Sequence, residues 1–391
     1  MRGLMASVGQ HADPIETARG IGRREFMTRI IAAPLVFSAA FRVRAPRLAF
    51  DPGQNPPITS PNSPFNRAFN FADLKTWITP NSDFFVRSHF GVPSADPARW
   101  TVTVSGAVER QISLSMDELL KLSSQDAVVT LECAGNLVGW GGVSNARWAG
   151  ASLRALLMHA GIKEGAQEVV LIGADGGAER EAGGMQIDSF ARGIPLAKAL
   201  DPATLLAYRM NGEPLPAEHG GPVRAVVPGW YGMDSVKWLK QVVVSRERFE
   251  GFYQTRRYYE RRLDGPVAKG GPLHPMRVKS QIARPLGDDV VVYRPVHVLG
   301  AAWAGEAEIA RVTVSFDGGR NWVDAELAPE RAPYAWRLWS YNWNPAAEGR
   351  YEIVARARDS AGNEQPLERD PRIITPYANN WADRRTIEVQ R

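Results

Sequence analysis

From about residue 65 the chain consists of short apolar runs, each ended by turn residues. Residues 128–131, 168–172 and 223–229 are runs of this kind and predict short β-strands. Apolar residues recur at helical spacing over residues 115–121 and 152–160, which predicts two helices among the strands. The mixture predicts an α+β domain, because the helices are few and do not alternate regularly with the strands.

The pattern changes in the last third of the chain to strict alternation of apolar and polar residues. Residues 310–316 alternate and run into Asp317-Gly318-Gly319, which indicates a hairpin. Residues 351–358 alternate again and end at a second turn. Four tryptophans are available to fill a core here: Trp322, Trp336, Trp339 and Trp343. Strands at this spacing predict an immunoglobulin-like β-sandwich of about 100 residues.

A Gly/Pro-rich stretch between the two patterns, residues 264–272, is typical of a linker. A chain of 391 residues is also longer than one hydrophobic core usually allows. We therefore predict two globular domains, the mixed domain at residues 50–265 and the sandwich at residues 272–388.

The N-terminal segment carries paired arginines, Arg23 and Arg24, before an apolar run at residues 30–37 that is too short to span a membrane. This arrangement resembles a bacterial twin-arginine signal, the type that exports proteins already folded. An ordinary amphipathic helix is the alternative. We predict a signal peptide at residues 1–45, a periplasmic location and a mature chain without a membrane span.

The net charge of +5 is concentrated in this segment, because residues 1–44 contain seven Arg and three acidic residues. Only +1 belongs to the rest of the chain, so a general nucleic-acid surface is not predicted.

The single cysteine excludes a disulfide within the chain and a zinc site of several thiolates. A covalent c-type haem would need Cys-x-x-Cys-His, which is absent, so an enzyme of this sequence would pass electrons to another protein.

The single cysteine, Cys133, follows a predicted strand and stands before Ala134 and Gly135, in a turn that allows close approach of a bulky ligand. Three interpretations are open at this point. The side chain is a small buried hydrophobe, a nucleophile activated by a nearby histidine, or a soft thiolate ligand of a transition metal.

Several segments carry a recognisable pattern in a fixed order along the chain: residues 84–93, the Cys133 turn, and residues 146–153, 194–199, 206–216, 219–224, 226–229 and 236–239. They closely resemble, in the same order, segments of the sulfite oxidase family of molybdopterin enzymes. The resemblance covers about residues 65–260, and the sandwich resembles the family's dimerisation domain more loosely. Residues 137–142 depart from the pattern, because they lack the paired arginines of the animal enzymes, which indicates a bacterial branch and leaves the substrate range open.

The resemblance implies that residues 50–265 form a molybdopterin-binding catalytic domain, with Cys133 as the protein ligand of molybdenum. The implied cofactor contacts are Phe85, Val86, Arg87, Ser88, His89, Cys133, Asp175, His219, Arg224, Ser235, Val236 and Lys237. The implied catalytic residues are Arg87, His89, Cys133, Tyr258 and Arg337. Tyr259 is an alternative to Tyr258, and Arg337 would come from the second domain. We interpret His159, His274 and His297 as structural.

The activity that the resemblance implies is oxidation of sulfite to sulfate by oxygen-atom transfer on a molybdenum cofactor. An external c-type cytochrome would accept the electrons, and the protein would act as a homodimer or with a haem subunit. Two alternatives stay open at this stage. One is a related molybdopterin enzyme acting reductively on nitrate or a sulfoxide, and the other is an exported binding protein without catalytic activity.

Overall fold

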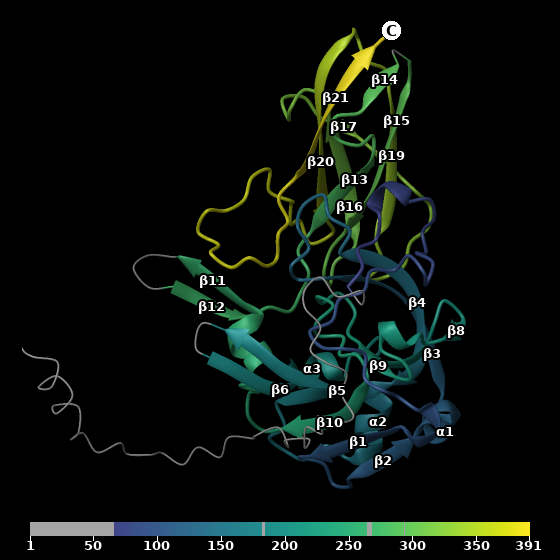
Figure 1. Cartoon of the computed structure of the whole chain (residues 1–391), viewed down its shortest axis with the longest axis vertical. Coiled ribbons are helices and arrows are strands. Elements are labelled where there is room, and N and C mark those ends of the chain that lie inside the picture. Colours follow the sequence, from purple (N-terminus) through teal and green to yellow (C-terminus); the bar gives the residue numbers. More distant parts are fainter. Residues whose placement is uncertain (1–65, 182–183, 264–267, 293) are drawn as a thin grey trace, which may run out of the picture. The chain divides into compact units, whose positions relative to one another are not determined.

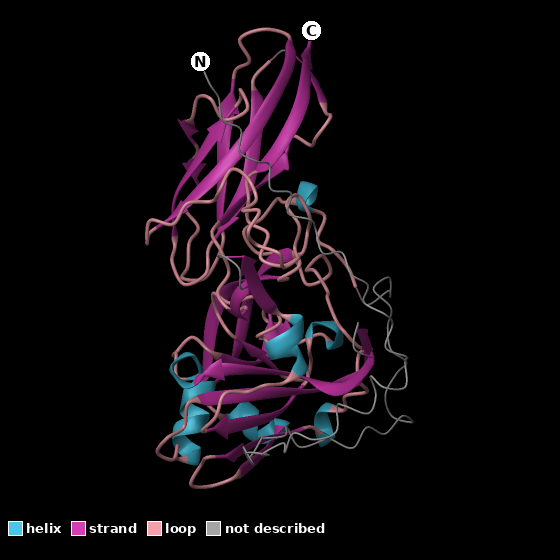
Figure 2. Ribbon diagram, turned by 90° about the vertical axis from the view of Figure 1, so that its left-hand side faces the viewer, coloured by secondary structure: helices cyan, strands magenta, loops and turns pink. Residues whose placement is uncertain are grey.

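The computed structural model describes residues 66–181, 184–263, 268–292 and 294–391 (Figure 1). The predicted signal peptide, residues 1–45, lies outside the described residues. Strands dominate, and most of the helices gather around the sheets of the N-terminal part (Figure 2). This confirms the predicted α+β class. No helix among the described residues has the length and apolarity needed to cross a bilayer.

Two five-stranded sheets form the N-terminal part, in the orders β2-β1-β10-β5-β6 and β3-β4-β7-β8, with β9 pairing to β7 in the second. The strands of the first are β1 Thr101–Gly106, β2 Ile112–Ser115, β5 Glu168–Glu181, β6 Gly184–Pro195 and β10 Leu239–Ser245. The strands of the second are β3 Ser124–Glu132, β4 Val143–Ser152, β7 Leu205–Met210, β8 Glu213–Pro214 and β9 Arg224–Val226. Only β1 and β10 pair in parallel in these sheets, so the order is mixed, as predicted.

Both predicted helices form, and local sequence explains where each begins. In α1, Met116–Lys121, the Ser115 hydroxyl accepts from the Glu118 N–H, and the Glu118 carboxylate accepts from the Ser115 N–H. In α2, Leu153–Ala160, the Ser152 hydroxyl caps the first turn and the helix ends at Gly161, whose φ is 73°. The remaining helices are α3 Leu196–Ala199, the 3₁₀ turns η1 Phe71–Asp73, η2 Pro97–Arg99 and η3 Ala217–His219, and the π-helix η4 Tyr253–Arg257.

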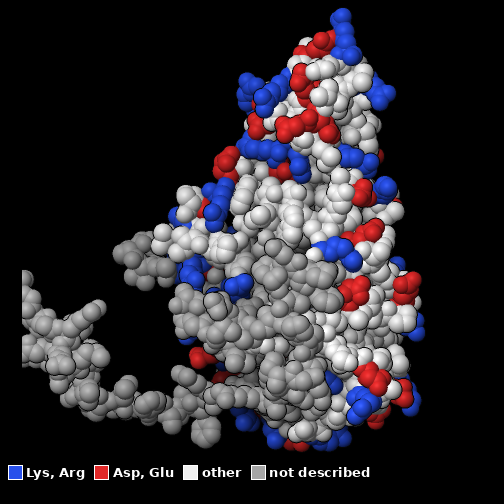
Figure 3. Space-filling model, in the orientation of Figure 1, with Lys and Arg blue, Asp and Glu red and all other residues white. Residues whose placement is uncertain are grey.

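The C-terminal part is a sandwich of two sheets, in the orders β13-β15-β19-β18 and β14-β21-β20-β16-β17. The first sheet comprises β13 Lys279–Arg284, β15 Val296–Trp303, β18 Glu326–Leu327 and β19 Arg337–Trp343. The second comprises β14 Val290–Val292, β16 Ile309–Ser315, β17 Val323–Asp324, β20 Gly349–Asp359 and β21 Asp383–Gln390. Lys and Arg side chains are interspersed with Asp and Glu on the face of the sandwich that Figure 3 shows.

Two of the four tryptophans fill the sandwich core as predicted, and two do not. Trp339 and Trp343 pack between the sheets. Trp336 lies in the core of the N-terminal part, where its ring meets Phe71 edge to face. Trp322 is half-buried and donates to the Gly319 carbonyl of its own hairpin. The prediction was wrong for these two because the sequence pattern does not show which core a loop tryptophan reaches.

The predicted linker is partly wrong as well, because β12, Ala268–Pro272, pairs antiparallel with β11, Tyr259–Leu263. A Cβ on Gly270 would lie 1.9 Å from the Glu260 carbonyl oxygen. Gly270 therefore allows β11 and β12 to approach each other closely. This part of the chain is a paired two-stranded ribbon and not the flexible linker that was predicted.

Candidate functional site

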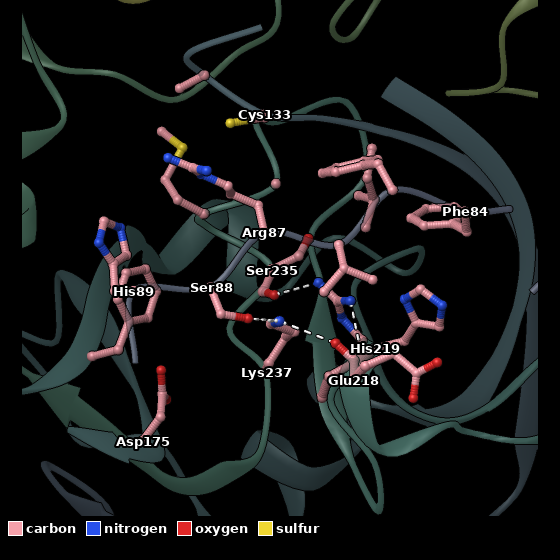
Figure 4. A pocket seen from close by; sticks show the side chains of 18 of the residues that line it. Phe84, Arg87, Ser88, His89, Cys133, Asp175, Glu218, His219, Ser235 and Lys237 are labelled. Atoms are coloured by element: carbon pink, nitrogen blue, oxygen red, sulfur yellow. Dashed lines mark hydrogen bonds between the residues drawn. The ribbon is translucent and has the colours of Figure 1, made fainter. Parts of the chain in front are cut away.

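A pocket in the N-terminal part holds most of the predicted site residues (Figure 4). It contains about 690 Å³ of empty space, a figure that includes its open mouth. Twelve predicted residues line it: Phe85, Val86, Arg87, Ser88, His89, Cys133, Asp175, His219, Arg224, Ser235, Lys237 and Tyr258. Sequence segments separated by more than a hundred residues thus meet in one cavity.

The segment from Phe84 to His89 is held on one side by apolar packing. Phe84 stacks on Phe85 with ring centroids 5.3 Å apart and meets Trp148 edge to face. The Val86 N–H donates to the Arg67 carbonyl at 2.8 Å. This anchoring leaves the next three residues, Arg87, Ser88 and His89, at the pocket, where Figure 4 shows them.

Cys133 follows the end of β3 and is held by backbone hydrogen bonds on both sides. Its N–H donates to the Gly142 carbonyl at 2.8 Å, and its carbonyl accepts from the Asn136 N–H at 2.8 Å. Burial raises the pKa of the Cys133 thiol, while the Gly135 N–H and the positive charge of Arg87 act in the opposite direction. The sulfur reaches the pocket from a turn whose conformation is fixed.

A second group of polar side chains lies deeper in the pocket. Lys237 Nζ donates to Ser88 Oγ at 2.5 Å and to the Glu218 carbonyl at 3.1 Å (Figure 4). Burial lowers the pKa of Arg224 to about 9 and also lowers that of Lys237, because both cations have lost solvent. An anionic group bound here would restore part of the lost solvation, so this end of the pocket is suited to a phosphate.

Arg224 uses its polar atoms in hydrogen bonds to the pocket wall, whereas Asp175 has an oxygen without a hydrogen-bond partner among the described residues. The Arg224 guanidinium donates to the carbonyls of His219 and Ser235, at 2.8 and 2.7 Å, so it orders the pocket wall as well as carrying charge. Asp175 is buried, and its Oδ1 has no hydrogen-bond partner among the described residues. Burial raises the pKa of this carboxyl, which favours the protonated form. A bound ligand with polar groups would satisfy this atom.

His89 and Tyr258 form a hydrogen-bonded pair at the pocket, with 2.6 Å between Nε2 and the phenol oxygen. The His89 ring lies against Phe190 and Tyr253, with centroids 5.3 and 4.8 Å away, so its position is fixed. Tyr259 starts β11 and does not line the pocket. Of the two tyrosines that the sequence left open, the structure brings Tyr258 to the site.

Arg337 and Val236 are the two predicted residues that do not line the pocket. Arg337 belongs to β19, and its Nη2 donates to the Ala328 carbonyl at 2.7 Å within the sandwich. The prediction that it reaches the site is therefore corrected, because its strand pairs within the sandwich sheet, opposite Ala302. Val236 is fully buried, and its carbonyl accepts from the Ala225 N–H at 2.9 Å.

The sequence reasoning missed a buried ion pair behind the pocket wall. Arg192 Nε donates to Asp234 Oδ1 at 2.8 Å, and neither side chain is exposed. The same guanidinium donates to the carbonyls of Tyr253 and Leu273, so it connects β6 with the π-helix that precedes Tyr258. The sequence did contain a signal for this ion pair, namely an arginine inside the apolar run of residues 190–194. A charge buried in such a run needs an oppositely charged partner, because an unpaired buried charge is strongly destabilising.

His219 gives a pH-dependent prediction for the cofactor-free protein. Burial lowers its pKa to about 4, with a smaller contribution from the Arg224 charge. The unfolded chain therefore binds the proton before the folded protein does, and stability falls as the pH drops below about 6.5, with about 2 kcal/mol lost at pH 5. Urea unfolding from pH 7.5 to 4.5 should show this loss in the native sequence and not in His219→Gln. Parallel stability profiles would contradict the assignment.

Two family models match the chain. One, described as the oxidoreductase molybdopterin binding domain, matches residues 89–253, and the other, the Mo-co oxidoreductase dimerisation domain, matches residues 272–390. The second match coincides with the observed sandwich.

Known proteins are similar over most of the chain. Mitochondrial sulfite oxidase of Rattus norvegicus is 34% identical, over 93% of this chain and 72% of its own length. NADH nitrate reductase 1 of Oryza sativa subsp. japonica is 33% identical, over 78% of this chain but only 38% of its own length. The crystal structure of the sulfane dehydrogenase SoxCD from Paracoccus pantotrophus is similar with a TM-score of 0.73 and 25% identity, over 93% of this chain and 98% of that one.

Proposed function

Because the chain belongs to the sulfite oxidase family of molybdopterin oxidoreductases, we propose that it oxidises sulfite to sulfate and passes the electrons to an external c-type cytochrome. One observation carries the proposal. The only thiol of the chain, the Arg87 guanidinium and a buried basic cluster share a single pocket. The chain is therefore an oxidoreductase and not an exported binding protein without catalytic activity.

The residues present fit the molybdenum cofactor. A thiolate suits a metal that changes oxidation state, and Cys133 would provide one from a rigid turn once the metal displaces its proton. Lys237 and Arg224 would bind the phosphate of the pterin, and the unsatisfied Asp175 oxygen would contact its polar groups. When bound, the cofactor supplies oxygen-atom transfer and accepts two electrons.

The substrate would bind at the exposed side of the pocket. Arg87 is exposed and lies close enough to Cys133 for its charge to affect the thiol. Its guanidinium holds an oxyanion through charge-assisted hydrogen bonds and offsets the repulsion between that anion and an electron-rich centre. Tyr258 and His89 provide a path by which a proton moves between the pocket and the protein, since a phenol and an imidazole both donate and accept.

The direct test is metal analysis of the purified native protein, followed by an assay of cytochrome c reduction. We expect about one molybdenum per chain and cytochrome reduction that depends on sulfite. The similarity to a nitrate reductase makes reduction of nitrate by a viologen dye the second candidate activity. A protein that contains molybdenum but turns over nitrate and not sulfite would exclude the proposed substrate.

The sandwich bears on how the enzyme assembles, and the twin-arginine pattern bears on where it acts. The match to a dimerisation domain supports a homodimer, and a complex with a haem subunit is the alternative. The twin-arginine pattern at Arg23 and Arg24 supports periplasmic export of the folded, loaded enzyme. Fractionation of the native host should place the activity in the periplasm, and substitution of both arginines by lysine should retain it in the cytosol.

Tyr258→Phe is expected to lower kcat with sulfite about 10- to 100-fold, because it removes the hydroxyl that bonds to His89 and leaves the ring packed. The KM for sulfite should change less, because Arg87 and not the phenol provides the charge that binds the anion. Steady-state kinetics of Tyr258→Phe and of the control Tyr259→Phe, which lies outside the pocket, measure the difference. If the two variants lose activity equally, the hydrogen-bonded pair has no special role.

A further inference from the structure

A buried carboxylate stands next to the proposed metal ligand. Glu132 ends β3, precedes Cys133 and is 2% exposed. Its Oε1 accepts from Lys279 Nζ at 3.0 Å and from Asn136 Nδ2 at 2.9 Å, and its Oε2 accepts from Trp303 Nε1 at 2.9 Å. Lys279 is also buried, at 1% exposure. Burying both charges is costly, and the complete set of hydrogen bonds offsets that cost only in this geometry.

Asn136 transmits this arrangement to the backbone around Cys133. Lys279 Nζ makes a second hydrogen bond, to the Asn136 carbonyl at 3.2 Å. The Asn136 side-chain oxygen accepts from the Gly142 N–H at 2.9 Å, and the Gly142 carbonyl in turn accepts from the Cys133 N–H at 2.8 Å. Hydrogen bonds thus run without interruption from the Lys279 ammonium group to both sides of the cysteine, and a shift of Lys279 would disturb the turn.

Two of the three donors to the Glu132 carboxylate come from the sandwich and not from the domain that carries the pocket. Lys279 begins β13 and Trp303 ends β15, so both belong to the matched dimerisation domain. Gln281, also on β13, donates from Nε2 to the Trp140 carbonyl at 3.1 Å. Strand β13 therefore contacts the turn that follows Cys133 at two places. Lys279 holds the start of the turn, and Gln281 holds its end.

We propose that the Glu132–Lys279 ion pair is a positioning device by which the sandwich fixes the Cys133 sulfur in the pocket. Neither residue lines the pocket, so both act through Cys133 as positioning residues and do not touch the substrate. The proposal rests on the proposed function to the extent that Cys133 is the molybdenum ligand. It assigns to the dimerisation domain a role in the geometry of the metal site, beyond association of two copies.

The test is the double variant Glu132→Gln/Lys279→Met in the full-length, loaded enzyme. It removes both charges together, so no unpaired buried charge remains to prevent folding. We expect a folded protein whose kcat is about tenfold lower at nearly unchanged KM, as for other residues that orient metal ligands. The electron paramagnetic resonance spectrum of its Mo(V) state should differ from that of the native enzyme. In the cofactor-free protein, iodoacetamide should alkylate Cys133 several times faster.

Glu306→Gln is the matched control, because it breaks another ion pair of a sandwich residue, with Lys198 Nζ at 2.8 Å, away from the pocket. It should leave the spectrum, the alkylation rate and kcat unchanged. Lys279→Arg keeps the positive charge and should retain a native spectrum. Should the double variant fail to fold, Trp303→Phe keeps both buried charges and removes only the donor to Glu132 Oε2, and it should show a smaller change in the same spectrum.

A folded variant that differs from the native enzyme only in thermal stability would overturn the inference. The same would follow if Glu306→Gln altered the Mo(V) spectrum as much as the double variant does. Failure of the proposed function would appear differently, as a native enzyme without molybdenum or without sulfite turnover.

Discussion

Cys133→Ser is expected to lower kcat with sulfite by at least about a thousandfold, or about 4 kcal/mol of activation free energy. The hydroxyl of serine is a hard, weakly acidic donor, whereas the thiolate of Cys133 is soft and suits a metal that changes oxidation state. The chain has one cysteine, so no neighbouring thiol can replace it. The fold should be retained, because the turn is held by backbone hydrogen bonds of Cys133 and not by its sulfur.

Molybdenum content, pterin content and sulfite turnover of Cys133→Ser are the measurements. The pterin should remain bound in part, since the basic residues deeper in the pocket are intact. Leu137→Ala, at an exposed position of the same turn, is the control and should retain full activity. Native turnover and native metal content in the serine variant would refute the assignment of Cys133 as the metal ligand.

Arg87→Gln is expected to lower kcat/KM for sulfite roughly 100-fold, mostly through KM, because a charge-assisted hydrogen bond to an anion contributes about 1.5–3 kcal/mol. The glutamine keeps a donor at the exposed side of the pocket but removes the charge that attracts the substrate. Loss of that charge should also weaken the dependence of kcat/KM on ionic strength. Initial rates over a range of sulfite and salt concentrations test both effects.

Two further variants decide whether the charge and its position both matter. Arg87→Lys keeps the charge without the planar pair of donors and should lie between the native enzyme and the glutamine variant. Arg154→Gln removes one positive charge from the exposed side of α2, away from the pocket, and should change neither kinetic constant. An equal effect of Arg154→Gln would mean that net charge, and not Arg87, attracts the anion.

Local sequence determined the elements and much of the pocket. Helix capping acts within a few residues, as at Ser115 and Ser152. The alternation of apolar and polar residues is equally local, as in residues 310–316 and 351–358. Each of these patterns could therefore be recognised directly in the sequence. The α+β class and the sandwich are confirmed for the same reason. The resemblance to the sulfite oxidase family supplied the site residues, twelve of which share one pocket.

Tertiary structure alone decided which distant residues meet. Arg337 follows its strand into the sandwich sheet, and of the two tyrosines it is Tyr258, directly after the π-helix, whose hydroxyl forms a hydrogen bond with His89. Glu132 and Lys279 are 147 residues apart, and no periodic pattern relates them. Hydrophobic patterning shows which face of an element is buried, but the partner of a buried charge depends on how two domains pack. The sequence thus determined what each segment becomes, and the packing of the domains decided what holds Cys133 in place.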